Sequence, residues 1–313
     1  MIRLSTNQMY NNSMNGVMQS YQRFSHVNNQ MSSGKRVLTP ADDPVAAAQT
    51  LNTRNRMAVV QQYNRNVDFA DKNLSLTEST LDQTEFALMQ MKDLAIQLGS
   101  DQWSDDQVRS SGLEAKETLN HMQGLVNTRN ESGEYIFAGS QADQKAYDGN
   151  TFVGDRIERE AQVADDTFIR MLTSGDRAFE DLEGLEPSDQ FGDGNPYPNN
   201  MLGVLQYFVD ATGNGNPPED VDKEAIRASI DNIDIAFEQV SKTRAQIGAR
   251  QNTLDAVKSS NEEFELFAKK SISDLEDLDY AEAYVRLETS LLSYQAGMQI
   301  TGRISGLSLF NYI

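Results

Sequence analysis

Side chains that could carry acid–base or metal chemistry are scarce in this chain. Its 313 residues include no cysteine and only two histidines, His26 and His121, which lie far apart in the sequence. A disulfide framework, a thiolate metal site and a thiol nucleophile are therefore excluded together. Histidine-based metal sites and catalytic triads also lack the residues they need. We expect both histidines to lie on the surface or at the edge of a helix contact.

Two segments have the composition of a ligand site but not its spacing. Residues 32–35, Ser-Ser-Gly-Lys, resemble the end of a phosphate-binding loop, yet that motif needs glycine where this chain has Asn29. Residues 189–195 could offer oxygen ligands to calcium, but the ligand spacing and final glutamate of a calcium-binding loop are missing. We interpret this acidic segment as a solvated turn.

Adjacent carboxylates at Asp42 and Asp43 could form an acid–base pair, but the following Pro44 indicates a structural role. Aspartate is a favoured N-cap residue, and proline is favoured at the first position of a helix. We therefore predict that a helix begins here. No catalytic, cofactor-binding or metal-binding residue is assigned anywhere in the chain, and we expect a protein that is not an enzyme and has no cofactor.

The charge of the chain restricts its partners. A formal net charge of -20 argues against nucleic acid or an anionic membrane surface, because both require a positive footprint. The charge is uneven, with net +4 in residues 1–60 and net -13 in residues 141–225. No cleavable secretory signal is visible in residues 1–30, and no segment has the length and apolarity of a membrane span.

The side chains most suited to a function are apolar and repeat along both ends of the chain. Their heptad-like spacing is typical of helices that bury a narrow face against another helix. We predict that the two terminal helices pair as a coiled coil and form an assembly interface. The residues of this interface are Tyr10, Met14, Val17, Tyr21, Phe24 and Met31 near the N-terminus, and Tyr284, Leu287, Leu291, Tyr294, Met298, Ile304 and Leu307 near the C-terminus.

Longer helices are predicted between these ends. Mostly apolar residues keep an unbroken three- and four-residue spacing over residues 60–98, and shorter runs follow over 108–126 and 226–254. Arg244 and Gln251 interrupt the last run with polar side chains. Helices of this kind pack most readily as an antiparallel bundle.

The pattern changes between residues 134 and 222. Short apolar groups at 135–137, 151–153 and 167–169 lie among glycine, aspartate and asparagine turns, which is typical of strands and hairpins. The sequence therefore predicts a small β-containing domain inserted between two helical halves.

The predicted fold is mainly α with this inserted small β domain, and consists of an elongated antiparallel helical rod formed by the N- and C-terminal segments. We expect three parts: a coiled-coil layer of terminal helices at 1–38 and 279–313, a long-helix rod at 39–139 and 223–278, and an outer β-rich domain at 140–222.

Several segments resemble the bacterial flagellin family. Residues 31–36 (MSSGKR) with 41–45 (ADDPV) look like the loop after the first helix of flagellins, and residues 243–252 (TRAQIGARQN) look like their return helix. Three further segments resemble the hook-associated junction branch of the family rather than filament flagellins. They are GEYIFAG at 133–139, DYAEA at 279–283 and LSLFNYI at 307–313.

This resemblance implies a secreted structural subunit of the extracellular bacterial flagellum, located in a ring at the hook-filament junction. Its implied partners are other copies of itself, the adjacent hook-associated protein, flagellin, and a cytosolic export chaperone. The resemblance also implies a transient cytoplasmic stage and export through the flagellar type III apparatus by an uncleaved signal.

Burial of the terminal stripes alone falls short of the entropy lost when some 60 terminal residues become ordered. We therefore expect the ends to fold when neighbouring subunits cover their remaining faces. Two other interpretations stay open at this point, namely a flagellin filament subunit and a cytosolic coiled-coil adaptor that is not exported.

Overall fold

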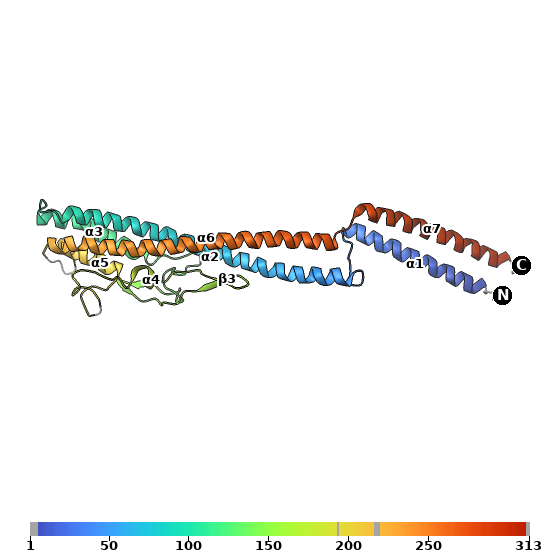
Figure 1. Cartoon of the computed structure of the whole chain (residues 1–313), viewed down its shortest axis with the longest axis horizontal. Helices are drawn as coiled ribbons and strands as arrows, with labels where there is room; N and C mark the ends of the chain where they lie inside the picture. The colour runs from blue at the N-terminus through green and yellow to red at the C-terminus, as the bar shows by residue number, and fades with distance from the viewer. Residues whose placement is uncertain (1–5, 193, 216–219, 311–313) are drawn as a thin grey trace. The chain divides into compact units, whose positions relative to one another are not determined.

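The chain divides into two compact units, one formed by residues 1–59 and 262–313 and the other by residues 60–261. The computed structural model describes residues 6–192, 194–215 and 220–310, and side-chain surroundings in these ranges from residue 8 to residue 304. Figure 1 shows that helices dominate both units. The prediction of a mainly α-helical chain with a small β-containing insertion is confirmed.

The helices are α1 (Thr6–Ser33), α2 (Pro44–Leu98), α3 (Asp105–Leu125), α4 (Gly175–Phe179), α5 (Met201–Val209), the π-helical turn η1 (Asp210–Asn214), α6 (Lys223–Glu276) and α7 (Tyr280–Phe310). The strands are β1 (Tyr147–Asp148), β2 (Thr151–Phe152), β3 (Glu160–Ala164) and β4 (Thr167–Arg170). They form two separate antiparallel hairpins, β1–β2 and β3–β4.

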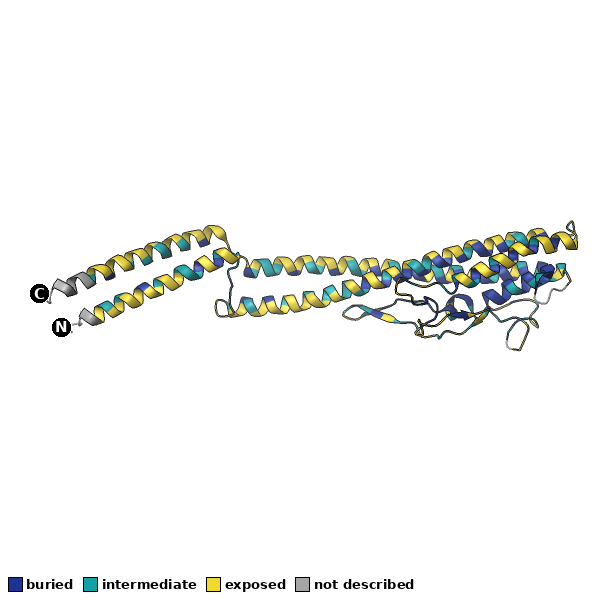
Figure 2. Ribbon diagram, turned by 180° about the vertical axis from the view of Figure 1, so that it is seen from behind, coloured by how far each residue is buried: buried dark blue, intermediate teal, exposed yellow. Residues whose placement is uncertain are grey.

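The core of the second unit is built on the predicted apolar repeats of α2 and α6. On α2 one buried series follows three- and four-residue spacing without a break, and on α6 one buried apolar series recurs every seventh residue, with Ser229, Ala236 and Thr243 also buried between its members. The two series are Val67, Ala70, Leu74, Thr77, Leu81, Thr84, Leu88, Met91, Ala95 and Leu98 on α2, and Ile226, Ile233, Val240, Ile247 and Leu254 on α6. Figure 2 shows this alternation of buried and exposed faces along both helices. The periodicity of the sequence therefore located the helical core correctly.

The two polar interruptions of the α6 repeat contact α2 directly. Arg244 lies within 2.8 Å of carboxylate oxygens of Glu78, Asp82 and Glu85. Its hydrogen bonds to Glu85 and Glu78 raise the pKa of its guanidinium. Gln251 donates a hydrogen bond of 3.1 Å to the hydroxyl of Ser75. Arg244 and Gln251 are therefore part of the contact between α6 and α2, although they interrupt the apolar repeat.

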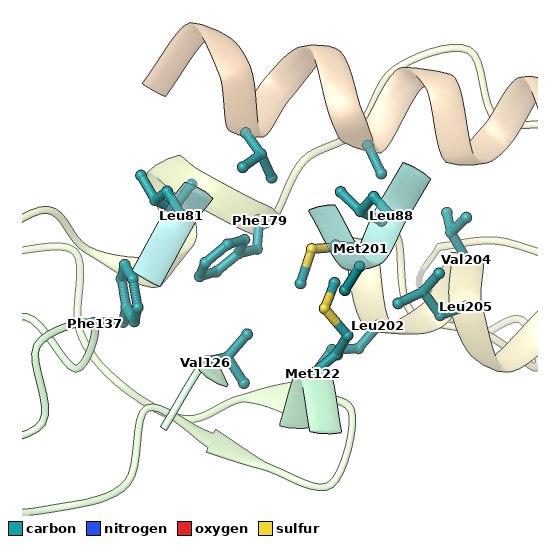
Figure 3. Close-up of a cluster of buried hydrophobic side chains, with 14 of the residues drawn as sticks. Leu81, Leu88, Met122, Val126, Phe137, Phe179, Met201, Leu202, Val204 and Leu205 are labelled. Carbon is teal, nitrogen blue, oxygen red and sulfur yellow. The ribbon is translucent and has the colours of Figure 1, made fainter. Parts of the chain in front are cut away.

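The inserted segment shares the core of the helices instead of forming a separate one. Phe137, Phe179 of α4 and several residues of α5 are buried together with side chains of α2 and α3 (Figure 3). The labelled cluster consists of Leu81, Leu88, Met122, Val126, Phe137, Phe179, Met201, Leu202, Val204 and Leu205. In Figures 1 and 2, α4, α5 and the β3–β4 hairpin lie on the same side of the long helices of this unit.

The strand expected at 135–137 is wrong, whereas those expected around 151–153 and 167–169 are present as β2 and β4. Residues 135–137 are buried in a turn between Gly133 and Gly139, which both have positive φ angles of 80° and 73°. At Gly139 an added Cβ would lie 2.1 Å from Oδ1 of Asp155, so the turn requires glycine there. Its apolar side chains are buried for packing and not because they belong to a sheet.

A polar network is enclosed where the insertion meets α5. Glu180 accepts hydrogen bonds from the Tyr147 hydroxyl at 2.7 Å and from the amide of Asn200 at 2.9 Å through the same Oε1 atom. Burial raises the pKa of Glu180, and the charges of Asp176 and Asp181 raise it further, although the two hydrogen bonds oppose this shift. The carboxylate is therefore held in an environment that disfavours its charge.

Replacing Arg244 should destabilise the second unit measurably. In Arg244→Leu, Glu85 keeps a side chain that is only 13% exposed but loses its cation, so we expect a loss of about 1–3 kcal/mol in the free energy of unfolding. Urea denaturation followed by circular dichroism measures this loss. Lys258→Leu is the matched control, because Lys258 also joins α6 to α2, through Asp68, but both partners are about half exposed. That variant should lose less than ~1 kcal/mol, and an equal loss in both variants would contradict the argument.

Replacing Glu180 should change how stability depends on pH. Because its folded pKa is raised, the folded state binds the proton more tightly, and the stability gained from protonation disappears as pH rises through the folded pKa. Glu180→Gln keeps an acceptor for Tyr147 and Asn200 without the charge. At pH 7 we expect the variant to melt a few degrees above the parent chain, since each kcal/mol of added stability raises the melting temperature by about 2–4 °C. This difference in melting temperature should shrink toward pH 4. Thermal melts across this range provide the measurement, with the exposed Glu183→Gln as control; a difference that grows on acidification would refute it.

Candidate functional site

The terminal helices α1 and α7 pack side by side through a narrow seam (Figure 1). Val17 and Val27 are buried on α1, and Ala283 and Thr301 are buried on α7. The hydroxyl oxygens of Ser13 and Thr301 lie 2.7 Å apart within hydrogen-bonding distance. The most deeply buried positions of the contact are therefore occupied mainly by small apolar and hydroxyl side chains.

The residues predicted for the interface fall into two groups. Val17 is buried, and seven others are half-buried along the seam: Tyr10, Phe24, Met31, Leu287, Leu291, Tyr294 and Ile304. Four are exposed: Met14, Tyr21, Tyr284 and Met298. Tyr21 still reaches the seam, since its ring centroid lies 5.7 Å from that of Tyr294. The side chain of Leu307 lies outside those that the structure describes.

Sequence reasoning missed the small residues that allow the helices to approach. Gly297 is one of them, because a Cβ atom there would lie 3.1 Å from Cγ2 of Val17. Heptad-spaced small or short side chains mark this face on both helices: Ser13, Ser20 and Val27 on α1, and Ala283, Ser290 and Gly297 on α7. On α1 the predicted residues Met14 and Tyr21 each lie one position after the seam residues Ser13 and Ser20. A search for small residues at seven-residue spacing would have found the seam.

Large apolar side chains remain uncovered on the outer faces of both terminal helices, and Figure 2 shows these faces as mostly exposed. They include Met14, Met18, Tyr21, Tyr284, Val285, Leu292, Met298 and Ile300. Single exposed apolar residues are ordinary, but a repeated series along a helix pair is typical of an interaction surface. The exposed members of the predicted interface belong to this series.

An open groove of about 620 Å³ runs between α1 and α7 on one of these faces. Its lining is mainly apolar and contains the cationic side chains of Arg23 and Arg286 beside Val27 and Val285. His26 also lines it, and its Nε2 atom lies 3.6 Å from Oδ1 of Asp42. The groove therefore combines an apolar floor with positive charge.

A cluster of polar contacts joins the end of α6 and the connection that leads to α7 to the segment after α1. The backbone amide of Arg36 donates to the carbonyl of Glu276 at 2.6 Å, and the amide of Leu278 donates to the carbonyl of Gly34 at 3.0 Å. The Glu276 carboxylate lies 3.2 Å from Lys35 Nζ and 2.5 Å from Arg54 Nη2. These contacts bring together segments from opposite ends of the sequence.

Both aspartates of the loop before α2 have structural roles: Asp43 caps α2 as predicted, whereas Asp42 binds amides within the loop itself. Asp43 accepts a hydrogen bond of 3.0 Å from the amide of Ala46 and is bound by Arg36, and these contacts lower its pKa. Asp42 accepts hydrogen bonds from the amides of Thr39 and Leu38, at 2.8 and 3.0 Å, and the Thr39 bond is the main cause of its lowered pKa. Both carboxylates are thus held in the charged form, which makes them poor proton donors at neutral pH.

Within the described residues, no group of three or more His, Cys, Asp and Glu side chains is arranged to hold a metal ion. His121, the second histidine, is exposed on α3. Lys35 of the segment that resembled a phosphate-binding loop follows the C-terminal end of α1, where Gly34 has a φ angle of 71°. A search of the described helices for membrane spans finds none that is sufficiently long and apolar. The feature with the strongest functional character is therefore the exposed surface of α1 and α7.

Comparison with known proteins agrees with the resemblance seen in the sequence. Residues 4–142 match the model of the bacterial flagellin N-terminal helical region, and residues 230–313 match that of the C-terminal helical region. The flagellar hook-associated protein 3 of Escherichia coli is 27% identical over 99% of both chains. The protein of the same name from Salmonella typhimurium has the same identity and coverage.

The fold is also that of a solved structure, the flagellar junction protein FlgL of Legionella pneumophila. The TM-score is 0.57 at 17% sequence identity, and the match covers 73% of this chain and 100% of the other. The two family models flank the insertion and together cover well over half of the sequence. The chain belongs to the bacterial flagellin family.

Proposed function

We propose that this chain is a structural subunit of the bacterial flagellum that forms the junction between the hook-associated proteins and the flagellin filament. The observation that carries the proposal is the match, over 99% of both chains, to relatives named flagellar hook-associated protein 3. The coverage includes both terminal segments and the insertion. The geometry agrees with a structural role, since the best candidate surface is a pair of helices with uncovered apolar faces.

In this proposal the terminal helices form the inner part of the assembly and are completed by neighbouring subunits. The seam between α1 and α7 buries small side chains, whereas the larger Met14, Tyr21, Tyr284 and Met298 remain exposed. Association with other copies in a ring, with the adjacent hook-associated protein and with flagellin would cover these side chains. The heptad positions that do not serve the intramolecular seam then serve contacts between subunits.

The proposal also includes export before assembly. The chain would leave the cytoplasm through the flagellar type III apparatus, accompanied there by an export chaperone, and reach the extracellular flagellum. The absence of cysteine is compatible with this route, because no disulfide can form on arrival in an oxidising space. The mostly exposed terminal helices would be the parts that become stably folded on assembly.

Substitution on the exposed face should separate assembly from folding. Tyr284 is 57% exposed, so Tyr284→Asp should leave the stability of the monomer within about 0.5 kcal/mol of the parent chain. In cells that lack their own copy of the protein, this variant should fail to support filaments and should release flagellin into the medium. Electron microscopy of the cells and immunoblots of the medium measure these two effects.

Ile157→Asp is the matched control, because Ile157 is 63% exposed but lies in the insertion. This control should support normal filament numbers. If Tyr284→Asp also supports them, the exposed face of α7 is not part of the interface. Growth of long filaments from the purified parent chain would instead identify a filament subunit.

Folding on assembly predicts a contrast in amide exchange within the isolated chain. Residues 5–30 and 285–310 should exchange within seconds, while the buried repeat of α2 between Val67 and Leu98 should be protected by several orders of magnitude. Hydrogen–deuterium exchange with mass spectrometry compares the monomer with intact junctions. Strong protection of the terminal segments in the monomer would show that they fold without neighbours.

A further inference from the structure

Two arginine side chains, Arg170 of β4 and Arg177 of α4, flank the buried carboxylate of Glu158. A third arginine on α6 lies close enough for its pKa to be affected by Glu158; β3, α4 and α6 are labelled in Figure 1. Glu158 has a side chain only 7% exposed, and its two carboxylate oxygens lie 3.4 Å from Arg170 Nη1 and 3.5 Å from Arg177 Nε. Both distances are long for charge-assisted hydrogen bonds. Glu158 is therefore shared between two cations and bound closely by neither.

The third cation, Arg250, comes from α6 and is only partly exposed. Its Nη1 atom donates a hydrogen bond of 3.2 Å to the neutral hydroxyl of Thr173. Within the described part of the chain, no carboxylate lies within ion-pairing distance of Arg250. Burial lowers the pKa of its guanidinium. The charge of Glu158 opposes this shift, and the neighbouring charges of Arg170 and Arg177 lower the pKa further.

The local charges do not balance. Glu160, the remaining carboxylate of the cluster, lies 3.5 Å from Arg170 Nε, so three guanidinium groups face two carboxylates. This positive excess stands out in a chain with a formal net charge of -20. It is also accessible, because Arg170 and Arg250 line an open groove of about 370 Å³ together with Glu160, Phe168 and Ala249.

We infer that this groove binds a tetrahedral oxyanion, with Arg170 and Arg250 as its ligands. The planar guanidinium presents paired N–H donors that match two oxygens of a phosphate or sulfate group. The bound anion would give the Arg250 guanidinium an anionic partner within ion-pairing distance and would join β4 to α6. The site lies within the second unit and involves none of the residues of the terminal helices, so it does not depend on the proposed function.

Titration of the full chain with inorganic phosphate tests this inference, with isothermal calorimetry as the readout and sodium chloride used to keep the ionic strength constant. We expect saturable binding to one site in the parent chain and at least tenfold weaker binding in Arg250→Gln. Arg65→Gln is the matched control, since Arg65 hydrogen-bonds to Gln62 at 2.6 Å outside the cluster and should leave the affinity unchanged.

The melting temperature provides a second measurement for the same variants. Phosphate should raise it in the parent chain and in Arg65→Gln, but not in Arg250→Gln. A melt without phosphate verifies that Arg250→Gln is folded, and Arg170→Gln offers a second variant that should also bind at least tenfold more weakly.

Sulfate and glycerol 2-phosphate distinguish the source of the oxyanion. If phosphate and sulfate bind but glycerol 2-phosphate does not, the ligand is a small inorganic anion. If glycerol 2-phosphate binds as well, the ligand is a phosphate group carried by a larger molecule. Either result supports the site. Equal affinity of the parent chain and Arg250→Gln for phosphate, or an effect of phosphate that chloride reproduces, would overturn it.

Discussion

The pairing of segments from opposite ends of the sequence is the constraint on which the structure depends. A single amphipathic helix leaves its apolar stripe in water and is only marginally stable in isolation. In the second unit, α2 finds its partner in α6, and in the first unit α1 finds its partner in α7. Each long helix therefore requires a segment that is synthesised much later, and the insertion is accommodated between the two halves.

The nature of the contact differs between the two helix pairs. Between α2 and α6 the buried residues include many large aliphatic side chains and are supplemented by ion pairs such as that of Arg244 with Glu85. Between α1 and α7 the buried set is sparse and includes hydroxyl groups such as that of Thr301. The first kind of contact stabilises a folded subunit by itself, whereas the second leaves much of its apolar surface for other molecules. This contrast is the physical basis for assigning assembly to the terminal helices.

Much of this architecture could be predicted from the sequence because helix periodicity is a local signal. The buried series from Val67 to Leu98 and the cap formed by Asp43 both follow directly from residue spacing. The family could also be recognised from short segments. Helix α5 could not be predicted in this way, because eight of its nine residues are buried and no polar face marks a period.

The candidate site was predicted less completely, because periodicity does not reveal how closely two helices approach. Tyr284 and Met298 have the spacing and apolar character of seam residues, yet they are exposed. Gly297 and Ser290 carry little hydrophobic signal and still lie at the contact. The cluster of Arg170, Arg177 and Arg250 was missed for a different reason, since it depends on tertiary contacts between a hairpin and a distant helix.

The seven-residue repeat of small side chains in the seam has a consequence for alignment. If α7 slid along α1 by seven residues, about 10 Å at the helical rise, two of Ala283, Ser290 and Gly297 would take the place of another small residue. The seam therefore distinguishes poorly between such positions. The backbone hydrogen bond from Leu278 to Gly34 occurs once and has no equivalent after such a slide. Longitudinal registration of the terminal helices is thus fixed at one end, by the chain segment from which they both extend.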